Sequence, residues 1–178
     1  GTSVANAENI SKVIAIVKNA VQKDQTIVVV SALGGVTDLL LDAASLAAAG
    51  DQNFATKLQT VKQRHINTAN ELISKTATQP VLQLIEKAML EIEGLCSGLS
   101  LLGELTARSK DRIAHYGEWL SSQLIAAAFQ SNKVDAVWKD ARELIRTNST
   151  FGSATVDFAV TDKLIHDYFA KINHSLHI

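Results

Sequence analysis

The fold is decided by residues 26–41, which read Thr-Ile-Val-Val-Val-Ser-Ala-Leu-Gly-Gly-Val-Thr-Asp-Leu-Leu-Leu. Residues 27–30 are β-branched without alternation, so they predict a strand that is buried on both faces. Gly34 and Gly35 follow, where the backbone can adopt positive φ and approach a ligand closely. Thr37 and Asp38 then open an apolar helix, so that a hydroxyl, a carboxylate and free N–H groups meet at one helix N-terminus. This arrangement is suited to holding an anion, although ordinary α/β connections share it.

The composition predicts a folded domain without a membrane or nucleic-acid partner. The chain has 178 residues, 47% of them hydrophobic, which is enough for one domain with a full core. No run approaches the roughly 20 apolar residues of a membrane span. The net charge of −1 has mixed signs and gives no basic surface for nucleic acid. The start lacks a signal peptide, and Cys96 is the single cysteine, so a cytoplasmic location is predicted.

Helices separate the predicted strands. Apolar residues recur at helical spacing over residues 6–22, from Thr37 to near Gly50, and over 53–74, 106–132 and 158–173. Pro80 predicts the start of another helix that ends near Gly94, with loops over 76–79 and 98–103. Short strands are predicted at 134–138 and, just starting, at 175–178. The sequence therefore predicts one α/β domain with a helical insertion over about residues 50–105.

Gly117 and Glu118 form a second candidate site within the helix at 106–132. A glycine in mid-helix costs about 1 kcal/mol against alanine, which indicates close approach of another backbone or a ligand. Glu118 lies beside Trp119 in an apolar helix, and a carboxylate buried there needs a cationic partner from the protein or from a substrate. The alternative is a solvated glutamate on the outer face. No metal site is predicted, because the histidines share no ligand spacing with acidic partners.

Three separated segments carry a resemblance to a known family. They are the start Gly-Thr-Ser-Val-Ala-Asn-Ala-Glu-Asn, the turn Val-Val-Ser-Ala-Leu-Gly-Gly-Val-Thr-Asp-Leu-Leu, and Gly117-Glu118 followed by Asp140 and Arg146-Thr147-Asn148. In this order and spacing they resemble the amino-terminal part of the aspartokinase catalytic domain, over the whole chain. The resemblance implies an α/β fold of the amino-acid kinase type, a three-layer α/β/α sandwich that is incomplete in this fragment.

The resemblance also implies an activity. The γ-phosphoryl group of ATP, with Mg²⁺, would pass to the β-carboxylate of L-aspartate in the synthesis of lysine, threonine and methionine. The full-length protein would be a homodimer or a higher homo-oligomer. The family's catalytic lysine would precede Gly1, so no catalytic residue is assigned and the fragment alone is expected to be inactive.

Individual residues receive roles only through this resemblance. Gly1, Thr2 and Ser3 match the end of a glycine loop whose backbone lies against the transferring phosphate. The substrate-binding positions are matched by Ser31, Gly34, Gly35, Thr37 and Glu118. Among these, Ser31 and Thr37 match positions that contact aspartate or stand beside the phosphoryl path, and Glu118 matches the carboxylate that receives the α-ammonium of the substrate.

Other functions are compatible with parts of the pattern. A relative that acts on glutamate or acetylglutamate would share the glycine turns, but the Gly117-Glu118 segment behind a long helical insertion is not expected there. A non-catalytic binding module on the same scaffold is a second alternative. A Rossmann-type nucleotide-binding domain is disfavoured, because no G-x-G-x-x-G follows a strand.

Overall fold

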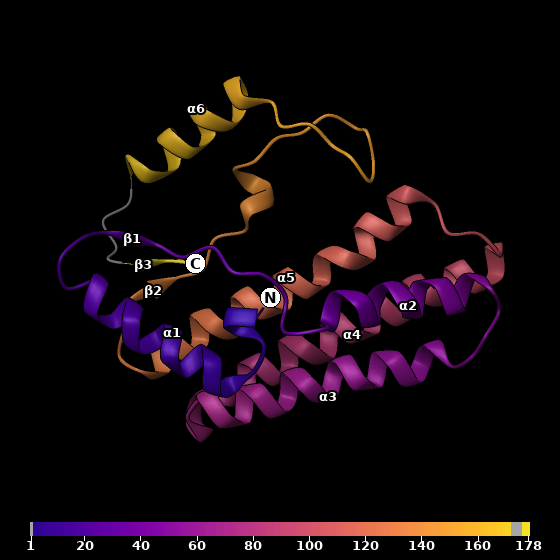
Figure 1. Ribbon diagram of the computed structural model, residues 1–178, viewed down its shortest axis with the longest axis horizontal. Coiled ribbons are helices and arrows are strands. Elements are labelled where there is room, and N and C mark those ends of the chain that lie inside the picture. Colours follow the sequence, from indigo (N-terminus) through magenta and orange to yellow (C-terminus); the bar gives the residue numbers. More distant parts are fainter. Residues whose placement is uncertain (1, 172–175) are drawn as a thin grey trace.

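The computed structural model describes residues 2–171 and 176–178 and places a bundle of helices beside a small sheet (Figure 1). Gly1, the end of the helix predicted at 158–173 and Ser175 lie outside the described residues. We call the bundle the helical body; it consists of α2 (Val36–Ala48), α3 (Phe54–Leu72), α4 (Lys75–Leu102) and α5 (Ala107–Ser131). These four helices share one continuous hydrophobic core.

In the described part of the chain, the sheet has three short parallel strands in the order β1-β3-β2. They are β1 (Thr26–Ile27), β2 (Ala136–Val137) and β3 (Leu176–His177). Leu176 of the central strand lies opposite Thr26 on one side and Ala136 on the other. Parallel strands joined through helices confirm the predicted α/β class.

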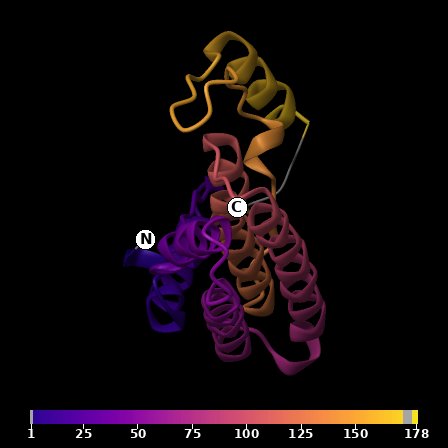
Figure 2. The ribbon, with the colours of Figure 1, turned by 90° about the vertical axis from the view of Figure 1, so that its right-hand side faces the viewer.

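Helices cover the sheet on opposite sides. In Figure 1, α1 (Ala7–Ala20) lies below the strands and α6 (Phe158–Phe169) lies above them. Figure 2 shows α6 and the segment before it on the far side from α1. The Asn6 side chain caps α1 by accepting the Asn9 N–H at 2.9 Å, and the apolar stripe of this helix is buried. The helix–sheet–helix order agrees with the predicted layers.

The predicted burial of residues 27–30 is wrong. Ile27 is 59% exposed and Val29 is 92% exposed. After β1 the chain soon leaves the ladder, whose last bond here runs from the Val28 N–H to the His177 carbonyl at 2.8 Å. Four β-branched residues favour extended backbone, but burial on both faces requires covering elements on both sides.

The predicted boundaries of α4 are also wrong. This helix begins at Lys75 rather than at Pro80, and it continues through the predicted loop at 98–103 as far as Leu102. Its buried face runs from Thr78 to Leu99, so packing against the neighbouring helices outweighs the proline and glycine signals. Gly103, at φ +70°, ends the helix with its N–H bonded to the Leu99 carbonyl at 2.9 Å.

Residues 146–157 form a hairpin-like segment that reaches back to α5. Thr147 and Val156 pair in an antiparallel bridge, and the Gly152 N–H donates to the Asp111 carboxylate at 2.8 Å. The Arg108 guanidinium lies 5.4 Å from the centre of the Phe151 ring. These contacts anchor the segment before α6 to the helical body. Across residues 2–171 and 176–178, no helix is both long and apolar enough to traverse a bilayer.

Candidate functional site

The glycine turn joins the start of the chain to the helical body. Gly35 precedes α2 in the left-handed region at φ +71°, and none of the side chains that the structure describes caps this helix. The Gly34 N–H donates to the Ala5 carbonyl at 3.3 Å, and a Cβ on Gly34 would lie 3.0 Å from the Ala5 Cβ. Glycine is therefore needed for the approach of residues 2–5. Thr2 and Ser3, in a 3₁₀ turn just before Ala5, are exposed near this turn.

Helix α5 packs closely against the same turn. A Cβ on Gly117 would lie 3.0 Å from the Ala32 Cβ and 3.6 Å from the Thr37 hydroxyl oxygen. The Ser121 hydroxyl donates to the Ser31 carbonyl one turn further along α5. The mid-helix glycine does mark a close approach, but the nearest atoms belong to side chains of the turn and not to the predicted backbone or ligand. Thr37 and the residue preceding Glu118 are thereby brought together.

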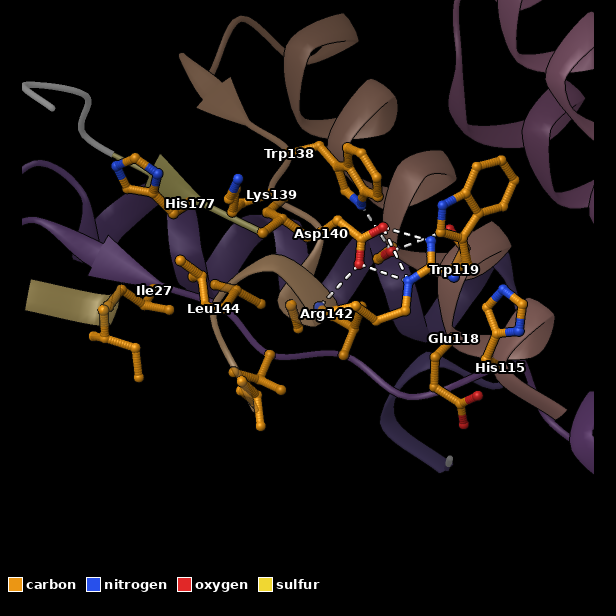
Figure 3. A pocket seen from close by; sticks show the side chains of 18 of the residues that line it. Ile27, His115, Glu118, Trp119, Trp138, Lys139, Asp140, Arg142, Leu144 and His177 are labelled. Atoms are coloured by element: carbon orange, nitrogen blue, oxygen red, sulfur yellow. Dashed lines mark hydrogen bonds and ion pairs between the residues drawn. The ribbon is translucent and has the colours of Figure 1, made fainter. Parts of the chain in front are cut away.

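Glu118 is exposed, so the alternative of a solvated glutamate is the one that the structure bears out. Among residues 2–171 and 176–178, no cation forms an ion pair with its carboxylate. Figure 3 shows this carboxylate pointing away from Asp140 and Arg142. The position is open to a ligand, and a carboxylate there can accept hydrogen bonds from an ammonium group.

A cavity of about 460 Å³ lies between the strands, α5 and α6 (Figure 3). Its walls are mostly apolar, and they include residues 27–30, Trp119, Trp138, Ile165 and Phe169. Glu118 also lines it. The indole N–H of Trp138 donates to the Ser122 hydroxyl at 2.9 Å, which fixes one wall. The site therefore combines a polar edge with an apolar interior, as small-molecule sites commonly do.

An ion pair that sequence reasoning had not assigned a role lies at this edge. Arg142 Nε lies 2.9 Å and 3.1 Å from the two Asp140 carboxylate oxygens. The hydrogen bond from Arg142 lowers the pKa of the Asp140 carboxyl below its ordinary value. Asp140 lies three residues beyond the end of β2, and polar residues near the carboxyl end of a parallel strand are the available sequence signal.

His115 gives the cavity a neutral edge near pH 7. Burial lowers the pKa of its imidazole below the ordinary value, and this outweighs the backbone hydrogen bond that raises it. Its Nδ1 lies 2.5 Å from the Arg112 carbonyl oxygen. The imidazole is therefore held by the backbone, and the nearby Asp140 carboxylate partly opposes the lowering of its pKa.

The structure brings together most of the residues that the sequence singled out. The turn with Gly34 and Gly35 contacts residues 2–5 on one side and the helix that carries Gly117 and Glu118 on the other. Gly1 lies outside the described residues. The assigned roles of Thr2, Ser3, Ser31, Gly34, Gly35, Thr37 and Glu118 remain predictions.

A parallel sheet with helices on both sides and a glycine turn at the start of α2 defines an α/β domain. Residues 1–174 match the family described as the amino acid kinase family, and the chain belongs to this family. The predicted family and fold are thus confirmed.

The relatives and a solved structure agree with this assignment. Aspartokinase 3, chloroplastic, from Arabidopsis thaliana is 33% identical over 176 residues, which cover 94% of this chain and 30% of that protein. Bifunctional aspartokinase/homoserine dehydrogenase 1, chloroplastic, from the same plant is 27% identical over 172 residues, with coverage of 96% and 19%. E. coli aspartokinase III in complex with aspartate and ADP superposes with a TM-score of 0.84 at 24% identity, covering 99% of this chain and 38% of that one. The chain thus spans between about a fifth and two fifths of the length of these proteins.

Proposed function

We propose that this chain is the amino-terminal part of the catalytic domain of an aspartate kinase, a phosphotransferase that moves the γ-phosphoryl group of ATP to the β-carboxylate of L-aspartate. Its family membership and its similarity to proteins named aspartokinases support this. The observation that carries the proposal is the approach of Thr37 to Gly117, beside Glu118. This contact joins the glycine turn to the helix that carries Glu118, and it supports the proposal.

In phosphoryl transfer the protein has to position the reactants and compensate their charge, and it need not form a covalent intermediate. Phosphoryl transfer proceeds when the acceptor and the phosphate are held in line and the developing negative charge is offset. The uncapped start of α2 offers backbone N–H groups for an anion. In this proposal Thr2, Ser3 and the glycine turn lie along the phosphate, Ser31 and Thr37 orient the substrate carboxylate, and Glu118 binds the α-ammonium group.

Mg²⁺ belongs to the proposal as the ion that accompanies ATP. Within the described part of the chain, no group of three or more His, Cys, Asp or Glu residues could hold a metal ion. A magnesium ion in kinases is held largely by the substrate phosphates. We therefore assign it no protein ligand here and derive no step through it.

The biological setting is also proposed. The acyl phosphate product would feed lysine, threonine and methionine synthesis, and the full-length protein would form a homodimer or a higher homo-oligomer. A cytoplasmic location remains our prediction, while the plant relatives are named as chloroplastic. Light scattering and fractionation of the source cells test the assembly and the location.

Steady-state kinetics of the full-length protein test the proposed reaction. We expect aspartate-dependent release of ADP, and none from residues 1–178 alone. Glu118→Gln should raise the KM for aspartate about 10- to 100-fold with little change in the KM for ATP, since one charged hydrogen bond is lost. Glu104→Gln, an exposed position before α5, is the matched control.

Two outcomes would replace the proposal. A preference for glutamate or acetylglutamate over aspartate would assign the protein to another branch of the family. Absence of turnover in the full-length protein, with ligand binding indifferent to Glu118→Gln, would favour a non-catalytic binding module.

A further inference from the structure

We infer that Arg64 of α3 is a positioning residue for phosphoryl transfer, because it holds the glycine turn from the side of the helical body. The inference rests on the proposed function, and it gives the helical insertion a part in the site. In the sequence, Arg64 is one of several polar residues of α3 with no assigned role.

The contact joins residues 30 positions apart in the chain. The Nη1–H of Arg64 donates a hydrogen bond to the Gly34 carbonyl, and the Arg64 side chain is half-buried. A Cβ on Gly35 would lie 3.1 Å from the same nitrogen, so the guanidinium lies directly against the turn. The Thr68 hydroxyl in turn donates to the Arg64 backbone carbonyl at 2.8 Å, within the well-packed part of α3.

This contact fixes the direction of the following amide. In a planar trans peptide the C=O and N–H bonds point in opposite directions. Because the Gly34 carbonyl points toward Arg64, the Gly35 N–H points away from it. The other amide of Gly34 is held as well, since its N–H donates to the Ala5 carbonyl at 3.3 Å. The turn is thus fastened from two separate elements.

The Gly35 N–H is left available for a ligand. In the described ranges 2–171 and 176–178, no carbonyl or side chain accepts this hydrogen. It lies at the start of α2, where the helix dipole already favours an anion. A preoriented donor of this kind stabilises developing negative charge without reorganisation during the reaction. Arg64 therefore acts on the reaction through the turn, and its positive charge adds to the same field.

The test compares two cations on the same helix of the full-length protein. Lys62 forms an ion pair with Glu86 of α4 at 2.6 Å and is the matched control. We expect Arg64→Met to lower kcat for aspartate phosphorylation about 10- to 100-fold, with the KM for aspartate changed less than about threefold, because a charged hydrogen bond is lost. Arg64→Lys should recover part of kcat, since an ammonium can still donate to the Gly34 carbonyl. Lys62→Met should keep wild-type kinetics.

Wild-type kcat in Arg64→Met would overturn the inference. So would an equal loss of kcat in Lys62→Met, which would point to general damage to the insertion. If Arg64→Met does not fold, the comparison of wild type with Arg64→Lys decides, because a merely structural cation would leave kcat unchanged after this replacement.

Amide hydrogen exchange separates this inference from the proposed function. We expect peptides over residues 33–38 to exchange faster in Arg64→Met or Arg64→Lys than in wild type, and to be unchanged in Lys62→Met. If the wild-type protein does not phosphorylate aspartate, the proposed function fails, and Arg64 is then judged by the exchange of the turn alone. Unchanged exchange in both Arg64 variants would refute the positioning role.

Discussion

Apolar residues on the inner faces of the helical body are buried, whereas some of those in and next to the sheet are exposed. Leu40, Leu58 and Ile92 of the helical body are all 0% exposed, whereas Val29, just beyond β1, is 92% exposed. Their hydropathies are similar, so the difference comes from the number of elements that cover each side chain. The four helices of the helical body enclose the first group, while Val29 lines the cavity next to the strands. Stability should therefore depend mainly on the buried side chains of the helical body.

Leu40→Ala should have the largest effect on stability. Deleting this fully buried side chain of α2 removes apolar contacts and leaves a cavity, which costs about 2–5 kcal/mol. Chemical denaturation measures the loss. Leu101→Ala is the control, because Leu101 is 89% exposed and its truncation should cost within about 0.5 kcal/mol. Similar losses at both positions would show that stability does not depend on burial in the helical body.

Acid should destabilise the helical body through His65. Burial lowers the pKa of this imidazole to about 4, and its Nε2 has no hydrogen-bond partner in the described part of the chain. The pKa of a histidine in an unfolded chain is about 6.5, so the unfolded chain binds more protons than the folded one between about pH 4 and about pH 6.5. Stability is full above about pH 6.5 and falls by up to about 3 kcal/mol as the pH drops towards 4.

Urea denaturation across this pH range tests the assignment to His65. The variant His65→Gln should lose the part of the pH dependence that lies between the two pKa values. His166→Gln, which changes an exposed histidine of α6, should keep the wild-type profile. A wild-type profile in His65→Gln would show that other groups cause the acid sensitivity.

Two helix glycines should respond to alanine with opposite signs. Gly117→Ala places a Cβ 3.0 Å from the Ala32 Cβ, so strain should outweigh the gain in helix propensity by about 1 kcal/mol. Gly94→Ala meets nothing within 4 Å and should stabilise α4 by about 0.5–1 kcal/mol. Thermal denaturation measures both. The same sign for the two variants would show that α5 does not approach the turn as described.

Lys62→Met should have the smallest effect. The Lys62 and Glu86 side chains are 24% and 53% exposed, so the ion pair between α3 and α4 is screened by water. Its loss should cost less than about 1 kcal/mol, and the difference from wild type should shrink in high salt. A larger loss would show that surface ion pairs, as well as the buried core, contribute to the stability of the helical body.

Local sequence patterns predicted where helices and strands lie better than they predicted what packs against them. The periodicity of residues 6–22 and the glycine pair before Thr37 gave α1 and the start of α2, because both signals act within a few residues. The start of α4 was missed because Pro80 is a local signal, whereas the packing that overrides it involves helices distant in the sequence. The exposure of Val29 was missed for the same reason.

The candidate site was predicted in part. The mid-helix position of Gly117 was enough to indicate a close contact, and the contact is with the turn that carries Thr37. The exposure of Glu118 could not be decided from periodicity alone. Arg64 gave no signal, because its partner Gly34 is 30 positions away and nothing in the sequence between them specifies that approach.

The buried face of α4 carries a thiol whose labelling rate can report the opening of the bundle. Cys96 is 0% exposed, and burial raises the pKa of its thiol to about 11. Alkylating reagents attack thiolates that they can reach, so they should modify the folded protein only when this helix separates from its neighbours. The rate at which iodoacetamide labels Cys96 then reports how often the bundle opens, and residues 1–178 contain no second cysteine that would add to this signal.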